Sequence, residues 1–248
     1  MKTETETYLA CLDNTYKFED DSQVKAVVTC EDGRTAVLTD KTIFYPQGGG
    51  QPADTGVIQS ETAKFQVNDV RMVNGQVYHY GTFSTGSFAL RDQVKLMISS
   101  ERRILNARLH SAGHVIDIAV QNLGLRWQPS KGYHFPDGPY VEYVGAIESA
   151  EDKEKFPKEI EAKAQSFISE NLPVKAVVSE SNEAKQLCGG ELPEYVDKSR
   201  PVRVVSIGNN SGCPCGGTHV KELKDLGALE ITKIKTKGDR IKVSYVLK

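Results

Sequence analysis

Residues 93–124 read QVKLMISSERRILNARLHSAGHVIDIAVQNLG, and the character of the sequence changes within this stretch. Residues 93–98 end a series of short, strand-like segments. Beyond them, apolar residues recur at helical spacing, and either Ser99 or Ser100 can cap the start of the helix. The stretch therefore predicts a strand followed by a long helix that ends near Gly124.

Upstream of this helix the sequence is mostly strand-like. Turn signals such as Asn74-Gly75 and the glycine run Gly48–Gly50 separate short segments that are rich in β-branched residues. The predicted strands are Val24–Cys30, Thr35–Thr39, Phe65–Val73, Gln76–Tyr80 and Gln93–Ile98. Many short strands without a credible helix predict a small β-barrel, which we assign to residues 1–98.

Downstream, helices and strands are mixed. Further helices are predicted near Glu151–Asn171 and from Ser181, as the N-cap, to Gly189. The predicted strands are Tyr140–Val144, Val174–Ser179, Val202–Ile207, Ala228–Lys235 and Ile241–Leu247, of which the last two form a hairpin. The chain is therefore predicted to be α+β, with an α/β domain over residues 99–248 whose sheet is mostly antiparallel.

The composition narrows the class of protein. The 248 residues are 39% hydrophobic and 26% charged, the balance of an ordinary globular chain. A formal net charge of -2 argues against a protein that coats nucleic acid without sequence preference, because such proteins are strongly basic. No apolar run is long enough to cross a bilayer, and the polar N-terminus lacks the regions of a signal peptide. We therefore expect a cytoplasmic protein with no membrane partner, in which five cysteines serve as ligands or catalysts more readily than as disulfides.

Two pairs of side chains predict a metal site. His110 and His114 are four residues apart, so on a helix they lie on one face and can bind one ion. Cys215 and His219 flank a Gly-Gly-Thr segment that lets the backbone curl and bring them together. Each pair alone is weak evidence, since helical histidines are often packing residues, but both pairs in a chain of five histidines favour a shared ion. Imidazole and thiolate favour zinc over magnesium or calcium, at one ion per chain.

Other chemistries fit these residues less well. Ser111 follows the first histidine, where HExxH proteases carry their glutamate base. Cys213-Pro-Cys215 matches a CxxC redox motif poorly, so Cys213 is expected to be a spare ligand or a buried small residue. His79 is expected to be a packed or surface histidine, and His134 to lie in a solvent-exposed loop.

The order and spacing of the two pairs resemble those of the alanyl-tRNA editing domain. Residues 40–56, DKTIFYPQGGGQPADTG, resemble the N-terminal signature of the AlaX proteins, the free-standing relatives of that domain. Arg102-Arg103 ahead of His110, and residues 213–219, CPCGGTH, are also similar to the AlaX pattern. These motifs cover both halves of the chain, and its length resembles the medium AlaX class.

The resemblance implies a trans-editing enzyme that hydrolyses serine, and in some members glycine, from mischarged tRNA(Ala). It implies a translation-factor-like barrel and an editing domain shared with threonyl-tRNA synthetases. It further implies that zinc is bound by His110, His114, Cys215 and His219. Gly113 departs from what we expect between the two histidines, because a bulkier residue would favour the helix by about 1 kcal/mol.

The same resemblance suggests roles for residues around the amino-acid pocket. Thr42, which would otherwise be an ordinary strand-edge threonine, is expected to hydrogen-bond the serine hydroxyl. Gln51 would supply a neutral amide, and the close approach of the tRNA terminus would be allowed by Gly48, Gly49 and Gly50. Arg102 and Arg103 are expected to hold acceptor-stem phosphates.

Two other functions stay open from the sequence. One is a zinc-stabilised tRNA-binding module without catalysis, which would lack an open coordination position on the metal. The other is a zinc hydrolase of small esters or amides, which is disfavoured because no glutamate base accompanies the histidines. An editing zinc could bind the α-amino group, orient the ester or activate water. No feature of the sequence indicates an obligate protein partner.

Overall fold

The computed structural model describes residues 6–248, which divide into two compact units. The N-terminal unit ends at Asn106, and the C-terminal unit spans Ala107–Lys248. The division falls inside helix α1 (Ser100–Asn122), whereas the predicted domain boundary after residue 98 precedes this helix. The helix therefore contributes its first turns to one unit and the remainder to the other.

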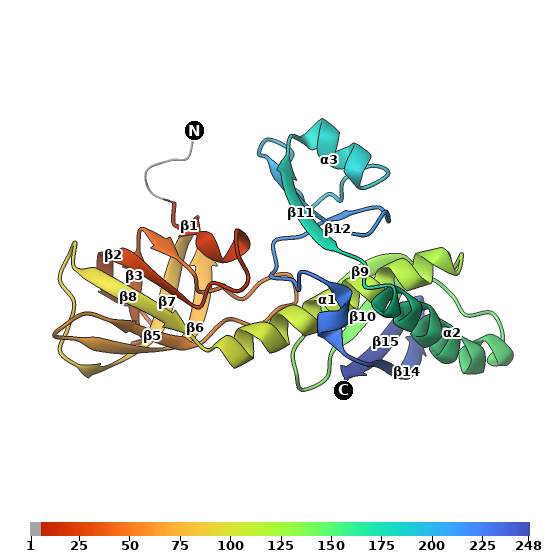
Figure 1. The fold of residues 1–248 in the computed structure, drawn as a ribbon, viewed down its shortest axis with the longest axis horizontal. Helices are drawn as coiled ribbons and strands as arrows, with labels where there is room; N and C mark the ends of the chain where they lie inside the picture. Colours follow the sequence, from red (N-terminus) through yellow and green to blue (C-terminus); the bar gives the residue numbers. More distant parts are fainter. Residues whose placement is uncertain (1–5) are drawn as a thin grey trace. The chain divides into compact units, whose positions relative to one another are not determined.

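The N-terminal unit is a closed, antiparallel barrel in the order β2-β3-β7-β6-β5-β8 (Figure 1). Its strands are β2 (Glu19–Thr29), β3 (Thr35–Thr39), β5 (Gly56–Gln59), β6 (Lys64–Val73), β7 (Gln76–Thr85) and β8 (Gln93–Ile98). Inward-facing side chains such as Val37, Phe65 and Leu96 are fully buried. A two-stranded parallel sheet and a 3-10 turn complete the unit: β1 (Tyr8–Leu9), β4 (Lys41–Thr42) and η1 (Ala10–Leu12).

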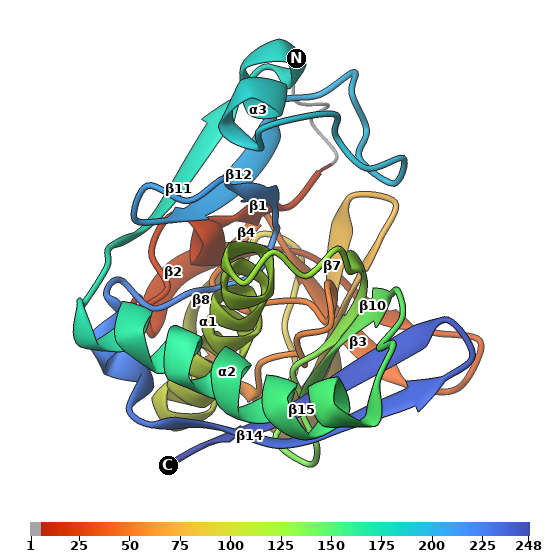
Figure 2. The same cartoon turned by 90° about the vertical axis from the view of Figure 1, so that its right-hand side faces the viewer.

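The C-terminal unit is α+β. One antiparallel sheet has the order β14-β15-β10-β9, and α2 packs against β14 (Figure 2). The second antiparallel sheet, β11-β12-β13, packs against α3. The element bounds are β9 (Gln128–Tyr133), β10 (Tyr140–Val144), α2 (Ala150–Ser169), β11 (Val174–Ser179), α3 (Ser181–Leu187), β12 (Val202–Ile207), β13 (Cys213–Pro214), η2 (Leu223–Leu226), β14 (Leu229–Lys237) and β15 (Arg240–Leu247). The predicted fold class, a β-barrel followed by an α/β part with antiparallel sheets, is confirmed.

Local sequence explains where α1 begins and ends. The hydroxyl of Ser99 accepts a hydrogen bond from Arg102 N at 3.3 Å, which caps the first turn. Just beyond the last turn, Gly124 adopts a φ of +70°, a left-handed conformation that favours glycine. Apolar residues at helical spacing, among them Val115 and Ile116, are buried in the main core of the C-terminal unit. This packing anchors the helix that carries both histidines of the HxxxH pair.

Strand β5 and the two-residue strands β1, β4 and β13 are absent from the prediction, and two further segments differ from it. Strand β9 has no sequence signal, since its QPSKGY segment contains proline and glycine and no β-branched residue; pairing with β10 makes it a strand. Ser181 is the first residue of α3 rather than its N-cap, and its hydroxyl donates to Lys198 O at 2.7 Å. Tertiary contacts decide both cases.

Within residues 6–248, no helix is both long enough and apolar enough to cross a bilayer. The polar N-terminal stretch that also supports the prediction of a cytoplasmic protein begins in residues 1–5, which lie outside the described part of the chain.

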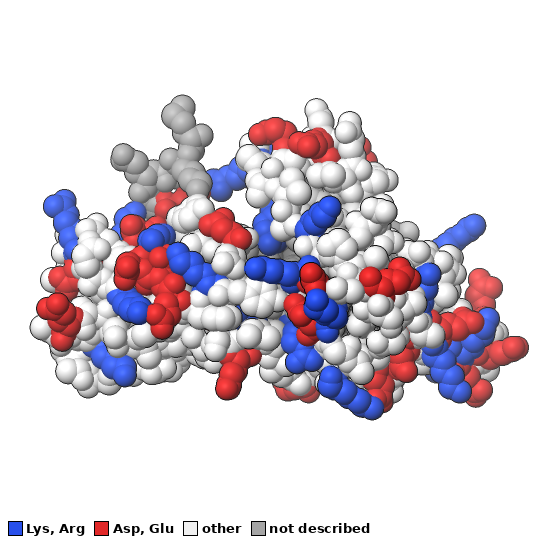
Figure 3. All heavy atoms as spheres, in the orientation of Figure 1, with Lys and Arg blue, Asp and Glu red and all other residues white. Residues whose placement is uncertain are grey.

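Charged side chains of both signs are interspersed over the face drawn in Figure 3. This distribution agrees with the small net charge of -2. On the β14–β15 hairpin, the ammonium of Lys235 lowers the pKa of the exposed Lys233 beside it. Lys242 Nζ lies 3.4 Å from the centre of the Tyr140 ring, a cation–π contact on the same sheet. The hairpin thus presents a local group of cations on a molecule of low net charge.

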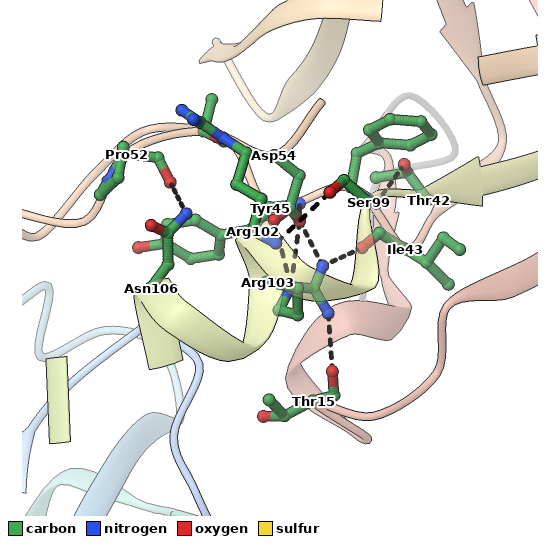
Figure 4. A network of polar contacts seen from close by, with 12 residues as sticks. Thr15, Thr42, Ile43, Tyr45, Pro52, Asp54, Ser99, Arg102, Arg103 and Asn106 are labelled. Atoms are coloured by element: carbon green, nitrogen blue, oxygen red, sulfur yellow. Dashed lines mark hydrogen bonds and ion pairs between the residues drawn. The ribbon is translucent and has the colours of Figure 1, made fainter. Parts of the chain in front are cut away.

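Within the N-terminal unit, a buried ion pair joins the first turn of α1 to the loop that precedes β5 (Figure 4). Arg103 and Asp54 are both fully buried and form a salt bridge through two guanidinium nitrogens. The remaining guanidinium donors of Arg103 reach Thr15 O, at 3.0 Å, and Ile43 O. The Asp54 carboxylate also accepts a hydrogen bond from Tyr45 N at 2.7 Å. A charge buried in this way is tolerated because its donors are satisfied.

This network revises the expected role of Arg103. The side chain is 0% exposed and fully engaged, which argues against the predicted contact with a tRNA phosphate. Its neighbour Arg102 donates to Ala53 O at 2.8 Å and keeps part of its side chain exposed, so a phosphate contact there stays a prediction.

Breaking the buried pair should be strongly destabilising. We expect Arg103→Ala to lower the free energy of unfolding by about 3–5 kcal/mol, because it leaves the Asp54 carboxylate buried without its partner. Arg71→Ala is the matched control: it removes a pair with Asp69, at 2.9 Å and with Arg71 41% exposed, and should cost at most about 1 kcal/mol. Urea denaturation measures both variants. Equal, small losses would contradict a supporting role for the buried pair.

Candidate metal centre

Four side chains from two distant segments converge in the C-terminal unit. Helix α1 supplies His110 and His114, and the loop that follows β13 supplies Cys215 and His219. One possible ligand atom of each residue lies within 4.8 Å of those of the other three. The structure thus brings together the two pairs that the sequence singles out.

The spacings around the thiol suit a tetrahedral ion. Cys215 Sγ lies 3.4 Å from His110 Nε2 and 3.5 Å from His219 Nε2. Bonds of about 2.3 Å to sulfur and 2.0–2.1 Å to nitrogen, at a tetrahedral angle, separate the two ligand atoms by about 3.5 Å. His114 Nε2 is buried with no hydrogen-bond partner among the described residues, which a bound cation would supply. The donor set and the unsatisfied Nε2 of His114 therefore fit a metal ion.

Burial keeps the imidazoles neutral. It lowers the pKa of His114 to about 4 and holds the pKa values of His110 and His219 well below the usual range for histidine. The neighbouring imidazoles and the Arg203 guanidinium add to this effect by electrostatic repulsion. At neutral pH the rings therefore carry the free lone pair that a metal ligand needs.

Arg203, on β12, holds the loop that carries Cys215 and His219, which we call the ligand loop. Its Nη1 donates to Cys215 O at 2.7 Å and to Gly217 O at 3.1 Å. Burial raises the pKa of the Cys215 thiol to about 11, although the backbone N–H of Gly217 and the positive charge of Arg203 oppose the rise. Because a metal binds the thiolate, binding here would release a proton.

Cys213 contacts one of the four possible ligands but does not belong to the group of four. Its Sγ lies 3.2 Å from His114 Nδ1. Metal-binding histidines commonly use their second ring nitrogen in a contact that fixes the tautomer and the ring orientation. With Nδ1 of His114 engaged by Cys213, the buried Nε2 is the nitrogen that remains for an ion. Cys213 therefore contacts a possible ligand directly and is more than a small packing residue.

Two further residues lie close to the possible ligands, although the sequence did not predict either of them to be part of the site. His134 was expected in a solvent-exposed loop, but it is 5% exposed and stacks on His110, with ring centroids 4.6 Å apart. The prediction for His134 was wrong because the preceding strand, β9, was not recognised.

Asp117 lies one turn beyond His114 and accepts a hydrogen bond from the Tyr143 hydroxyl at 2.6 Å. Burial raises the pKa of Asp117 to about 6; its spacing of three residues from His114 could have drawn attention to it.

The residues predicted to border the amino-acid pocket belong to the N-terminal unit. Thr42 is fully buried, and its hydroxyl lies 2.8 Å from His79 Nε2 while accepting from Phe44 N at 3.0 Å. His79 Nδ1 lies 2.8 Å from Val37 O, and since a carbonyl only accepts, Nδ1 carries the ring proton. His79 Nε2 therefore accepts the Thr42 hydroxyl proton, and burial lowers the pKa of His79 to about 4. His79 is packed, one of the two alternatives expected for it.

The glycine-rich loop is a tight turn. Gly48 and Gln51 exchange backbone hydrogen bonds of 2.9 and 3.2 Å. Gly49 and Gly50 have φ values of +54° and +77°, which favour glycine at both positions. The Tyr45 hydroxyl donates to Gly48 O at 2.9 Å, and Gln51 is fully buried. The loop is therefore held in a defined conformation.

Comparisons with known proteins follow the same division of the chain. A family model described as tRNA synthetases class II (A) matches residues 2–102. The model of the threonyl and alanyl tRNA synthetase second additional domain matches residues 202–242, which include two of the four possible ligands.

Individual relatives cover most of the chain. The alanyl-tRNA editing protein AlaX-M of Methanosarcina barkeri is 32% identical over 82% of this chain and 84% of its own. The editing protein AlaX-L of Pyrococcus horikoshii is 29% identical over 85% of this chain, and the alanine–tRNA ligase of Leptospira biflexa is 35% identical over 84%. The chain spans 50% of the length of that AlaX-L protein and 22% of the length of that ligase.

Proposed function

We propose that this chain, which belongs to the AlaX family of alanyl-tRNA editing proteins, is a cytoplasmic trans-editing hydrolase that removes serine from mischarged tRNA(Ala). The observation that carries the proposal is the group of three imidazoles and one thiol within 4.8 Å. Family membership supports alanyl-tRNA editing, and the ligand group supports a metal-dependent route to it. The substrate, the metal and the residue roles below are parts of the proposal.

Zinc is the metal that we assign to this centre, at one ion per chain. Three nitrogen donors and one thiolate match its preferred ligands, whereas magnesium and calcium prefer oxygen. A zinc ion held by His110, His114, Cys215 and His219 would supply Lewis acidity, which could polarise an ester carbonyl or lower the pKa of water.

The protein's own residues orient the reaction. An aminoacyl ester is already labile, so an editing enzyme gains more from positioning and electrostatics than from a strong nucleophile. Arg203 holds the ligand loop, and Cys213 holds the ring of His114. Asp117, one turn beyond His114 on the same helix, accepts a hydrogen bond from the Tyr143 hydroxyl at 2.6 Å, and burial raises the pKa of its carboxyl to about 6.

Serine selectivity would come from hydrogen-bonding capacity. The Thr42 hydroxyl donates to His79 and accepts from Phe44 N, which leaves it one acceptor site. A serine hydroxyl can donate to that site, whereas the methyl group of alanine cannot. Because Thr42 is fully buried, a substrate reaches its hydroxyl only after neighbouring groups move.

One observation favours a second function, a zinc-stabilised tRNA-binding module without catalysis. Four protein ligands complete a tetrahedral set, which is typical of structural zinc sites, while catalytic sites keep a position open. The two functions differ in whether the protein turns over a charged tRNA.

Turnover of charged tRNA separates the two functions. We expect wild-type protein to deacylate seryl-tRNA(Ala) and to spare alanyl-tRNA(Ala) by a factor on the order of 10⁴, because a site that pairs with a hydroxyl rejects its absence strongly. His114→Ala, which removes the ligand with the unsatisfied nitrogen, should abolish this activity. Initial deacylation rates on both substrates measure the effect. Binding of both tRNAs without hydrolysis would instead support the binding module.

The selectivity should depend on Thr42. Thr42→Val keeps the shape and removes the hydroxyl, so the rate on the serine substrate should fall and its ratio to the rate on the alanine substrate should narrow. Thr39→Val is the matched control, since Thr39 is also fully buried but its hydroxyl donates to Lys41 O at 2.9 Å. A ratio that is unchanged in Thr42→Val, or that changes equally in both variants, would remove Thr42 as the residue that recognises serine.

A further inference from the structure

The imidazole of His134 occupies a slot between two glycines of the C-terminal unit. A Cβ atom added at Gly113 in α1 would lie 2.3 Å from His134 Cε1, and one added at Gly132 in β9 would lie 2.5 Å from His134 Nε2. Side-chain carbons do not approach other atoms this closely, so any larger residue at either position would displace the ring. Neither glycine has a positive φ. The space that the ring needs, and not the backbone conformation, therefore accounts for both glycines.

A chain of hydrogen bonds fixes the ring within the slot. The Tyr245 hydroxyl lies 2.8 Å from Leu109 O and 2.7 Å from His134 Nδ1. A carbonyl oxygen only accepts, so the hydroxyl proton of Tyr245 points to Leu109 O, and His134 Nδ1 must donate to the tyrosine oxygen. This sets the tautomer of His134, with the proton on Nδ1. The ring is thus connected to β15 and to the helix that carries the metal ligands.

The fixed ring lies against a metal ligand. His134 and His110 stack with centroids 4.6 Å apart and planes inclined by 19°. The Nε2 atom of His110 faces Cys215 Sγ at 3.4 Å, so the plane of His110 determines where its lone pair points. His134 does not belong to the group of four possible ligands, and its Nδ1 is already used by Tyr245.

We infer that His134 is a positioning residue of the metal centre: held between Gly113 and Gly132 and bonded to Tyr245, it fixes the ring plane of His110 for metal binding. The inference rests on the proposed function, because it assumes that the four-residue group binds a metal. It also explains why Gly113 replaces a better helix former between the two histidines: an alanine there would strengthen the helix and displace His134.

Metal binding by glycine variants tests the inference. Gly113→Ala should weaken zinc affinity by on the order of 10-fold or more, as loss of a residue that orients a metal ligand commonly does. Gly138→Ala is the control, since a Cβ atom there meets nothing within 4 Å, and its zinc affinity should match wild type. Competition with a chromophoric chelator gives the affinities. The absorption spectrum of the cobalt(II)-substituted protein, which responds to ligand geometry, should change in Gly113→Ala only.

The double variant distinguishes displacement of His134 from a general effect of alanine. In a protein that already carries His134→Ala, adding Gly113→Ala should cause no further loss of zinc affinity, because there is no imidazole left to displace. The melting temperature should rise, because alanine favours the helix more than glycine does. A second loss of affinity in the double variant would overturn the inference.

Tyr245→Phe provides a test that does not depend on the folding of His134→Ala. It removes one hydroxyl and should alter the cobalt spectrum and weaken zinc affinity, with a modestly lower melting temperature of the metal-free protein, because His134 Nδ1 loses its acceptor. Unchanged affinity and an unchanged spectrum in Tyr245→Phe and in Gly113→Ala would overturn the inference while leaving the metal centre intact. Failure of wild-type protein to bind zinc would instead overturn the proposed function.

Discussion

Burial of imidazoles is the constraint on which the C-terminal unit depends. Three possible metal ligands and His134 lie close together with their pKa values lowered, so all four rings are neutral at neutral pH. Neutral rings can stack without repulsion, and the three that are possible ligands keep the lone pairs that a shared ion needs. The same burial leaves His114 Nε2 without a hydrogen-bond partner, so a cation at that point would stabilise the folded state as well as complete the site.

In the N-terminal unit, a buried polar side chain keeps its charge, in contrast to the neutral imidazoles of the C-terminal unit. Arg103 keeps its charge, and the Asp54 carboxylate and two backbone carbonyls satisfy its donors. Thr42 and His79 form a neutral version of the same arrangement, in which each donor meets an acceptor. In both networks the hydrogen bonds hold the buried side chains in one arrangement. Both networks include residues from the segment 40–56, which resembles the AlaX signature.

Sequence patterns predicted five of the six barrel strands, the long helix and the ligand pairs, because each of these signals is local; β5 (Gly56–Gln59) was missed. His110 and His114 are placed by the helix itself, and the CGGTH segment carries its own flexibility. His134 and Arg103 could not be placed in this way. The first depends on β9, whose strand forms only through pairing with β10, and the second depends on carbonyls that are far away in the sequence. Gly113, which was an anomaly within a helix, has its explanation in a ring contributed by another element.

X-ray absorption at the zinc edge tests the central claim, a zinc centre formed by His110, His114, Cys215 and His219, most directly. Protein purified without added metal should contain about one zinc per chain, with a first shell of nitrogen at about 2.0–2.1 Å and a single sulfur at about 2.3 Å. The sulfur contribution should persist in Cys213→Ser and disappear in Cys215→Ser. Absence of zinc, a shell without sulfur, or two sulfur ligands in the wild type would contradict the four-residue centre described for this protein.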